Sequence, residues 1–383
     1  MSINEKMTAI ADAIREKTGD SEKLNLDGMA LAIKNIEVGS GGVDLPEEAF
    51  NITGECAYRF AYGGWDWYIR EFGKKIKTVD ITNTDNMFYS SQLEDIPFEI
   101  NFKQSTSTSR MNYMFYKAQK LKSIPRINGK PKPYEFSNVF GECYNIRYFP
   151  EDIDEWFDWS SIENQTSSYT GNMANIFSLC SSLRKMPIKI FSHANKKLYY
   201  GYSFFTGMCN SCYALDELVG LPIPYTEAFT SNAFSNTLMR ANRLKRLTFD
   251  TPDGQPYVMK WKAQTLDVSY EVGYTSASTL ILNYNSGITA DKEVIDDATY
   301  QALKDDADWF TKKIEYSRYN HDSAVETINS LPDTSAYLAT AGGTNTIKFK
   351  GASGSKTDGG AISTLTQEEI AVATAKGWTV SLV

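Results

Sequence analysis

A recurring pattern of apolar residues constrains the fold of this chain more than any other feature. Three copies of the pattern are Phe115, Ala118, Leu121, Ile124 and Pro125; Phe140, Cys143, Ile146, Phe149 and Pro150; and Phe177, Cys180, Leu183, Met186 and Pro187. Weaker copies begin at Phe88, Cys209 and Leu238. Residues three apart share one face of a helical turn, and a proline marks the edge or exit of an extended segment. Each unit therefore predicts a helical turn that leads into a short strand.

The distance between units is uneven, which argues against a regular solenoid. Equivalent positions are 25 residues apart between Leu121 and Ile146 but 37 apart between Ile146 and Leu183. The extra length, at 151–171 and 192–203, predicts loops on one side of the array. In repeat proteins such loops often form the binding face.

Two short amphipathic helices are predicted before this body, at 4–17 and 27–36. Their apolar stripes contain Met7, Ile10, Ile14, Met29, Ile33 and Ile36. A pair this small does not bury a stable core alone, so we expect it to attach to copies of itself or to another protein. Packing of the pair onto its own body is the alternative. The Gly39–Gly42 stretch predicts a flexible linker, which favours a detached segment.

The region from about residue 270 onward predicts helices that alternate with strands. Strands are expected at 279–284, 346–349 and 378–383, and a helix at 291–306. Ser323 with Glu326, and Thr366 with Glu369, have the spacing of capping boxes, so each pair is expected to open a helix.

Composition excludes several classes of function. A formal charge of -8 and a pI near 5.1 argue against nucleic acid as a partner. The N-terminus lacks the apolar core of an export signal, and no run of about 18 apolar residues predicts membrane insertion. Five cysteines, an odd number spread over the chain, fit synthesis in a reducing cytosol better than a disulfide framework.

Motifs for chemistry are weak, and we predict no enzyme activity, no cofactor and no metal. Cys209 and Cys212 have the spacing of half a zinc knuckle, but a second pair is missing, and Cys212 fits the apolar frame beside Cys143 and Cys180. The stretch from His321 to Ser323 is better interpreted as a helix start than as a triad. The acidic residues at 151–158 could supply a carboxylate pair for glycan cleavage, or they could form a solvated loop.

Aromatic clusters outside the frame are the candidate binding residues. Trp65, Trp67 and Tyr68 form one cluster, and Trp156, Phe157 and Trp159 form another. The predicted receptor or glycan contacts are Trp156, Trp159, Tyr199, Tyr200 and Tyr202, which lie in the two longest insertions. Aromatic faces bind sugar rings and anchor protein interfaces. The alternative is that these rings fill gaps between uneven units.

Three segments carry a resemblance to a known class of proteins. Residues 7–19 and 24–30 resemble the N-terminal signature of tail and fibre proteins from phages of Gram-positive gut bacteria. The unit at 111–125 resembles the BspA-type leucine-rich repeat, and the ending at 365–379 is similar to the last repeat of such phage proteins. An irregular leucine-rich repeat serves many binding roles, so it indicates function only weakly.

The resemblance implies a virion component of the tail, made in the host cytoplasm, that attaches through its N-terminus and contacts a host-surface glycan or protein. Its partners would be other tail proteins and copies of itself. A bacterial surface adhesin and, third, a glycan depolymerase are the alternatives.

The expected fold class is α+β, a short N-terminal helical segment followed by an irregular leucine-rich-repeat-like solenoid. The expected parts are 1–37 for attachment, 38–44 as linker, 45–270 as body, and 271–383 as C-terminal helix–strand repeats and cap.

Deletion of residues 1–36 is expected to leave the body folded, because the apolar stripe of this segment is too small to support the body core. Circular dichroism of the shortened chain checks this. Unfolding of the remainder, or unchanged incorporation into virions, would contradict the attachment role.

Overall fold

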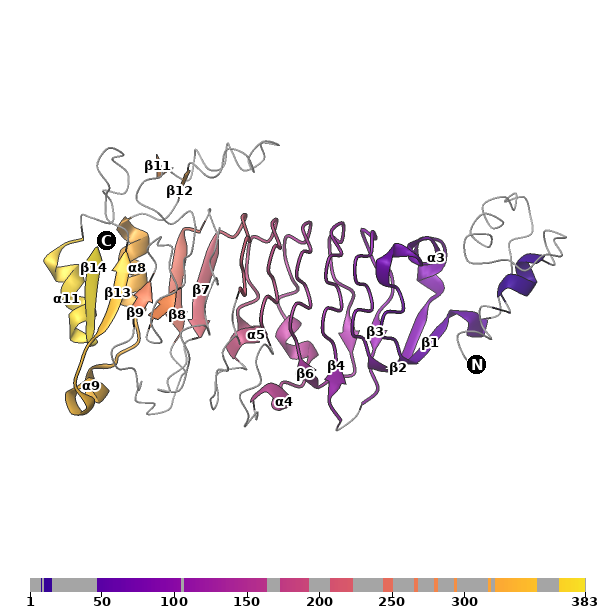
Figure 1. Cartoon of the computed structure of the whole chain (residues 1–383), viewed down its shortest axis with the longest axis horizontal. Helices are drawn as coiled ribbons and strands as arrows, with labels where there is room; N and C mark the ends of the chain where they lie inside the picture. Colours follow the sequence, from indigo (N-terminus) through magenta and orange to yellow (C-terminus); the bar gives the residue numbers. More distant parts are fainter. Residues whose placement is uncertain are drawn as a thin grey trace.

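The structure is a computed structural model, and the residues it describes are 8, 10–15, 47–104, 107–163, 173–192, 207–222, 244–250, 265–267, 279–281, 293–294, 316–317, 321–349 and 365–382. Figure 1 shows an elongated body in which short segments of chain lie side by side, with β1 (Asn51–Glu55) toward one end and β14 (Trp378–Leu382) toward the other. The mixture of helices and strands confirms the α+β class.

Short parallel strands link successive segments of the body. After β1 come β2 (Lys77–Asn83), β3 (Ile100–Asn101), β4 (Ser109–Arg110), β5 (Ile127–Asn128), β6 (Pro133–Glu135), β7 (Glu217–Pro222) and β8 (Arg246–Asp250). They form sheets in the orders β1-β2-β4-β6, β3-β5 and β7-β8. Every strand pairing among the described residues is parallel, so each strand is followed by a segment that carries the chain back before the next strand begins.

Short helices precede β1 or occupy several of these connections. They are η1 (Glu47–Phe50), η2 (Ala61–Gly63), α3 (Asp66–Phe72), η3 (Gly73–Lys75), η4 (Ile153–Trp156), α4 (Ser160–Glu163) and α5 (Lys189–Ser192). The buried Asp66 of α3 accepts hydrogen bonds from the Ser91 hydroxyl at 2.9 Å and the Gln92 N–H at 2.6 Å. Helix α3 is thereby tied to the next segment of the body.

The apolar frame forms tight turns instead of the predicted helical turns. A further turn around Phe60, which the sequence pattern did not include, has the same form, and Phe60 is counted with the frame phenylalanines from here on. In each turn the residues two before and two after the frame phenylalanine, or Cys209, have a positive φ. These pairs are Tyr58 and Tyr62, Asn86 and Ser90, Tyr113 and Lys117, Asn138 and Glu142, Asn175 and Leu179, and Gly207 and Ser211. A left-handed residue breaks an α-helix after a few residues, so the helical interpretation was wrong for these segments.

Main-chain N–H groups that a helix would bond internally are bonded to the next turn instead. The N–H groups of Phe88, Phe115 and Phe140 donate to carbonyls of the following turn at 2.8, 2.9 and 3.1 Å. The left-handed residues on each side donate in the same way, as Tyr113 N does to Ser137 O and Lys117 N to Gly141 O. The turns therefore form a parallel hydrogen-bond ladder of their own.

The ladder brings the frame phenylalanines into one column. Ring centroids are 5.3 Å apart for Phe60 and Phe88, 5.4 Å for Phe88 and Phe115, 5.8 Å for Phe115 and Phe140, and 5.6 Å for Phe140 and Phe177. The last three pairs are nearly parallel, with interplanar angles of 3°, 9° and 7°. Adjacent strands lie about 4.8 Å apart, so in-register backbones place like rings within stacking distance.

The core continues from this column into the C-terminal region. One buried cluster extends from Phe50 to Trp378 and includes Ile328, Ile347 and Phe349. The C-terminal elements are β9 (Thr265–Asp267), β10 (Thr279–Ile281), β11 (Glu293–Val294), β12 (Tyr316–Ser317), α8 (His321–Asn329), α9 (Ser335–Ala341), β13 (Asn345–Phe349) and α11 (Gln367–Ala375). Strands β10-β9-β13-β14 form one sheet, so a residue range assigned to the body, 265–267, pairs with the C-terminal part.

Several C-terminal predictions can be compared with these elements. Strands β10, β13 and β14 confirm the predicted strands, and the capping box of Thr366 and Glu369 opens α11 as expected. Ser323 does not cap a helix, because α8 begins two residues earlier and the Glu326 carboxylate is bound by Arg246. Of the predicted helix at 291–306, only 293–294 is described, and it forms strand β11.

Removal of one ring from the phenylalanine column is expected to destabilise the body strongly. Phe140 is fully buried between Phe115 and Phe177, so Phe140→Ala leaves a cavity and should cost about 3–5 kcal/mol of unfolding free energy. Chemical denaturation measures the change. Tyr148→Ala, at a side chain that is 60% exposed, is the control and should change stability by less than about 0.5 kcal/mol. Equal effects from the two variants would contradict the role of the column.

Candidate functional site

The two described tryptophans among the predicted contacts are buried. Trp156 and Trp159 are 4% and 3% exposed and belong to the core cluster. The Arg126 guanidinium lies 4.5 Å from the centroid of the Trp156 ring, and the Trp159 indole donates to the Asp154 carbonyl at 2.7 Å. The prediction that they offer exposed faces to a ligand is therefore wrong. The insertion folds back as η4 and α4, and its rings fill space beside Phe136.

The other predicted contact and attachment residues are mostly outside the described residues. This applies to Tyr199, Tyr200, Tyr202, Met7, Met29, Ile33 and Ile36. Ile10 and Ile14 are described, lie in a helical segment, and are buried within the single chain at 8% and 1% exposure. Neither side chain belongs to the main core cluster, and the attachment role of the N-terminal helices stays a prediction.

The frame cysteines pack as small hydrophobic residues. Cys143, Cys180 and Cys212 are fully buried and unpaired, and each thiol donates to the carbonyl of the frame phenylalanine one turn earlier. The sulfur–oxygen distances are 3.2, 3.0 and 3.1 Å to Phe115, Phe140 and Phe177. Among the described residues, no group of three or more His, Cys, Asp or Glu side chains could hold a metal ion.

Two carboxylates of the acidic insertion have lowered pKa values. The Arg126 guanidinium, 2.5 Å from Asp152, holds the pKa of that carboxyl below its ordinary value, and the Ser160 side chain does the same for the pKa of Asp158. Glu151 lies 3.6 Å from Lys185. A glycosidase acid needs a raised pKa, so Asp152 and Asp158 are unsuited to that role.

A second pair of carboxylates, Asp85 and Glu135, accepts hydrogen bonds from the same residue, Asn112. These bonds give both carboxylates a structural role. The Asn112 side chain donates to Glu135, and its main-chain N–H donates to Asp85 at 2.9 Å. Burial raises the pKa of Asp85, while Arg110, with its Nε 2.9 Å from the carboxylate, opposes that shift. Because Asp85 links successive turns through Asn112, its burial is explained by the ladder.

A row of tyrosines lies along the edge of three turns, and we call Tyr62, Tyr89, Tyr113 and Tyr116 the tyrosine row. Ring centroids are 5.3 Å apart for Tyr62 and Tyr89, 5.4 Å for Tyr89 and Tyr116, and 5.3 Å for Tyr113 and Tyr116. Tyr62 is 68% exposed and Tyr113 37%. Sequence reasoning missed the row because it considered only aromatic residues outside the frame. The signal was present for Tyr89, Tyr113 and Tyr116, since each lies within two residues of a phenylalanine of the predicted frame.

Contacts with the next turn hold Tyr116, the last residue of the row, in place. The Tyr116 hydroxyl donates to Glu142 at 2.5 Å, and burial, together with this contact, raises the pKa of Tyr116. The Tyr116 ring also lies over Gly141, where an added Cβ would come within 2.9 Å of it. A glycine at 141 therefore makes room for the ring to lie flat along the next turn.

Two members of the row adopt a costly backbone conformation. Tyr62 and Tyr113 have φ of 61° and 57°. A residue other than glycine in the left-handed region costs on the order of 1–3 kcal/mol, and asparagine tolerates it better than bulky residues. Tyr62 gains little burial to offset this cost. Packing alone does not explain a tyrosine at this position.

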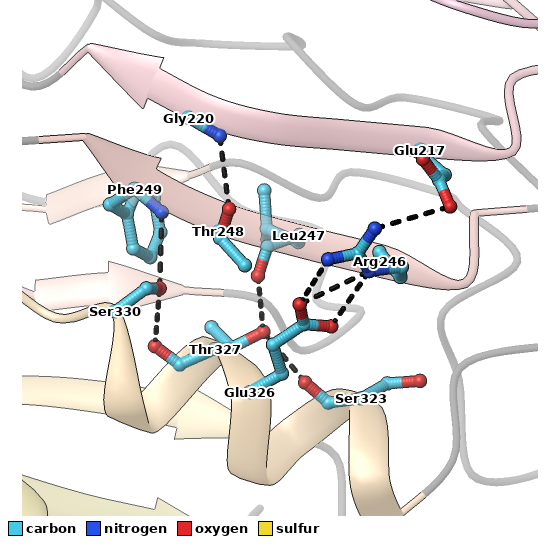
Figure 2. A network of polar contacts seen from close by, with 10 residues as sticks. All are labelled: Glu217, Gly220, Arg246, Leu247, Thr248, Phe249, Ser323, Glu326, Thr327 and Ser330. Atoms are coloured by element: carbon cyan, nitrogen blue, oxygen red, sulfur yellow. Dashed lines mark hydrogen bonds and ion pairs between the residues drawn. The ribbon is translucent and has the colours of Figure 1, made fainter.

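A groove of about 600 Å³ opens on another part of the body, across four segments of the chain. Its apolar lining includes Tyr148, Phe149, Met186, Pro187 and Ile188, and charged side chains also line it. Arg246 is one of these charged residues. Figure 2 shows its guanidinium between Glu217 and Glu326.

The polar network around Arg246 fastens α8 to the end of the body. Arg246 Nε lies 3.0 Å from Glu326 Oε2 and Nη2 lies 2.5 Å from Oε1, a bidentate ion pair that lowers the pKa of Glu326. The Thr327 hydroxyl donates to the Leu247 carbonyl at 2.6 Å, and the Phe249 N–H donates to the Ser330 hydroxyl at 3.1 Å (Figure 2). Helix α8 and Ser330, which directly follows it, thus satisfy main-chain groups of β8.

Comparisons of the chain with protein-family models, with curated proteins and with solved structures find no match. The resemblance to phage tail proteins therefore stays a prediction based on the quoted segments. Among the described residues, no helix combines the length and hydropathy needed to cross a bilayer.

Thiol labelling is expected to be slow in the native protein. Burial raises the pKa of Cys180 to about 12, so almost no thiolate forms at pH 8, and the other described cysteines are also fully buried or nearly so. A chromogenic disulfide reagent should react with the cysteines only after denaturant is added. Rapid native labelling of Cys143, Cys180 or Cys212, or stoichiometric zinc in the purified protein, would contradict this assignment.

Proposed function

We propose that this chain is a non-catalytic structural protein of a phage tail, at the fibre or the tail tip, that contributes to recognition of the host surface. We further propose that its body is an irregular leucine-rich-repeat-like solenoid. Other tail proteins and copies of itself would bind its N-terminal segment, and a host glycan or protein would bind the body. Such a chain is made in the host cytoplasm and resides in the virion.

One observation carries the proposal: an elongated hydrogen-bonded stack of turns presents exposed tyrosines along its edge. Turns that share a left-handed pair, a buried phenylalanine and a buried small residue support the solenoid assignment. A stack of this kind provides a rigid surface whose side chains vary while the core is kept. The quoted N-terminal and C-terminal segments direct the proposal toward phage tails.

The location of the chain in virions tests the proposal. Phage particles are purified from cultures that produce the chain and are analysed by mass spectrometry and by immunogold electron microscopy. We expect the chain at the tail, and we expect an excess of the purified full-length chain to reduce adsorption of the phage to its host. A phage protein of an unrelated part of the virion, such as a capsid protein, is the control for labelling and for competition.

Two results would contradict the proposal. The first is absence of the chain from purified particles together with recovery in the bacterial envelope fraction of phage-free cells, which would favour the adhesin alternative. The second is release of reducing ends from host polysaccharides by the purified chain, which would assign it to the depolymerases.

A further inference from the structure

We propose that the tyrosine row binds an extended, uncharged polysaccharide, whose sugar rings lie along Tyr62, Tyr89 and Tyr116 across three successive turns. The inference rests on the proposed function, since it names the host-surface ligand and the residues that would hold it.

The backbone provides the first argument. In other turns, the position two residues before the frame residue is occupied by Asn86, Asn138, Asn175 or Gly207, which tolerate a positive φ. Tyr58 and Tyr113 occupy the same position and depart from this rule. Tyr62 lies on the other side of the phenylalanine, where the other turns hold Ser90, Lys117, Glu142, Leu179 and Ser211, so its exposure and not its backbone singles it out. Tyr58 and Tyr62 are 55% and 68% exposed, so the fold gains little from these rings. A residue that departs from the preference for asparagine or glycine at a positive φ, and gains no burial in return, is more readily explained by function than by folding.

The arrangement of the rings provides the second argument. Neighbouring rings in the row are tilted by 51° and 42°, whereas the last three pairs of the phenylalanine column are nearly parallel. Tilted rings do not cover each other's faces, and Tyr62, at 68% exposure, offers the largest ring surface to a ligand, while Tyr89 and Tyr116 are half-buried and would contribute less of theirs. Sugar rings pack their C–H faces on such aromatic surfaces. A phenolic hydroxyl can also donate a hydrogen bond to a sugar hydroxyl or accept one from it. The repeat of about one ring per turn suits a ligand that is itself a chain of rings.

The charges beside the row favour a neutral ligand. Lys117 Nζ lies 5.3 Å from the centroid of the Tyr116 ring, and 4.0 Å from the Glu142 carboxylate that accepts the Tyr116 hydroxyl. The cation and the anion that touch the row therefore offset one another. A wall polymer rich in phosphate would need an excess of cations, which these two residues do not supply.

The width of the row argues against a protein as its partner. A specific protein interface covers about 800 Å² on each side, with an apolar centre. The row is a single line of tyrosine side chains that extends over three turns and contains no aliphatic residue. Its shape matches an extended polymer better than a globular surface.

Asparagine substitutions separate a binding role from a structural role. Tyr62→Asn and Tyr113→Asn each place a residue that tolerates a positive φ at a left-handed position, so we expect an unchanged or higher melting temperature. Binding of the full-length chain is measured on immobilised neutral rhamnose-, glucose- and galactose-containing cell-wall polysaccharides, with glycerol-phosphate teichoic acid beside them. Loss of an aromatic anchor should weaken binding to a neutral polysaccharide at least about 10-fold.

Tyr148→Asn is the matched control, because Tyr148 is 60% exposed but lines the groove instead of the row. It should bind as the unmodified chain does. Wild-type binding by folded Tyr62→Asn and Tyr113→Asn variants would overturn the proposal, as would loss of binding in Tyr148→Asn alone, or no binding to any neutral polysaccharide. A change of oligomeric state by light scattering in Tyr62→Asn would instead assign the row to contacts between copies.

These measurements use the purified chain without phage particles, so the two proposals fail independently. Glycan binding that depends on Tyr62 would persist even if the chain proved to be absent from virions. A chain found in the tail that ignores neutral polysaccharides would keep the proposed function and remove only this ligand.

Discussion

Hydrogen bonds between the main chains of successive turns are the interaction on which the rest of this structure depends. The N–H groups of Tyr113, Phe115 and Lys117 donate to the next turn at 3.2, 2.9 and 2.9 Å, and the same three positions donate in neighbouring turns. Because a ladder of this type requires matching positions to lie side by side, it aligns phenylalanine with phenylalanine. The stacked column, the buried thiols and the tyrosine row all follow from that alignment.

Left-handed residues make the ladder possible. A positive φ on each side of Phe115 turns the chain twice within five residues, so that alternate N–H groups point to the next turn instead of back along a helix. The conformational cost at each position is offset by hydrogen bonds that would otherwise be unsatisfied in a buried backbone. This balance allows lysine, glutamate and leucine, as well as asparagine and glycine, to occupy the left-handed positions.

The sequence predicted which side chains are buried better than it predicted the conformation of the backbone. The spacing of three from Phe140 to Cys143 to Ile146 identified buried positions, because burial selects for apolar side chains whatever the local dihedral angles are. The same spacing suggested a helix, since period three does not distinguish a helical turn from consecutive tight turns. Asn86, Asn138, Asn175 and Gly207 were the available signal, as each lies two residues before a frame position and favours a positive φ.

The candidate site was harder to predict than the core. Trp156 and Trp159 were chosen because they lie in an insertion, but an insertion long enough to form η4 and α4 can bury its own aromatic residues. The tyrosine row was overlooked because its members alternate with core residues in the same turns. Whether a tyrosine in such a turn points inward or outward depends on the left-handed backbone, which the apolar pattern alone does not reveal.

The direction of the ladder has a mechanical consequence. Its hydrogen bonds join segments that follow one another along the long axis of the body, so a pull between the two ends loads the interfaces between turns in series (Figure 1). A sideways force is instead shared among all the bonds of an interface and the packed rings beneath it. Under axial tension the weakest interface opens first while the other turns keep their own bonds. The body would therefore lengthen in steps, dissipating the load one turn at a time.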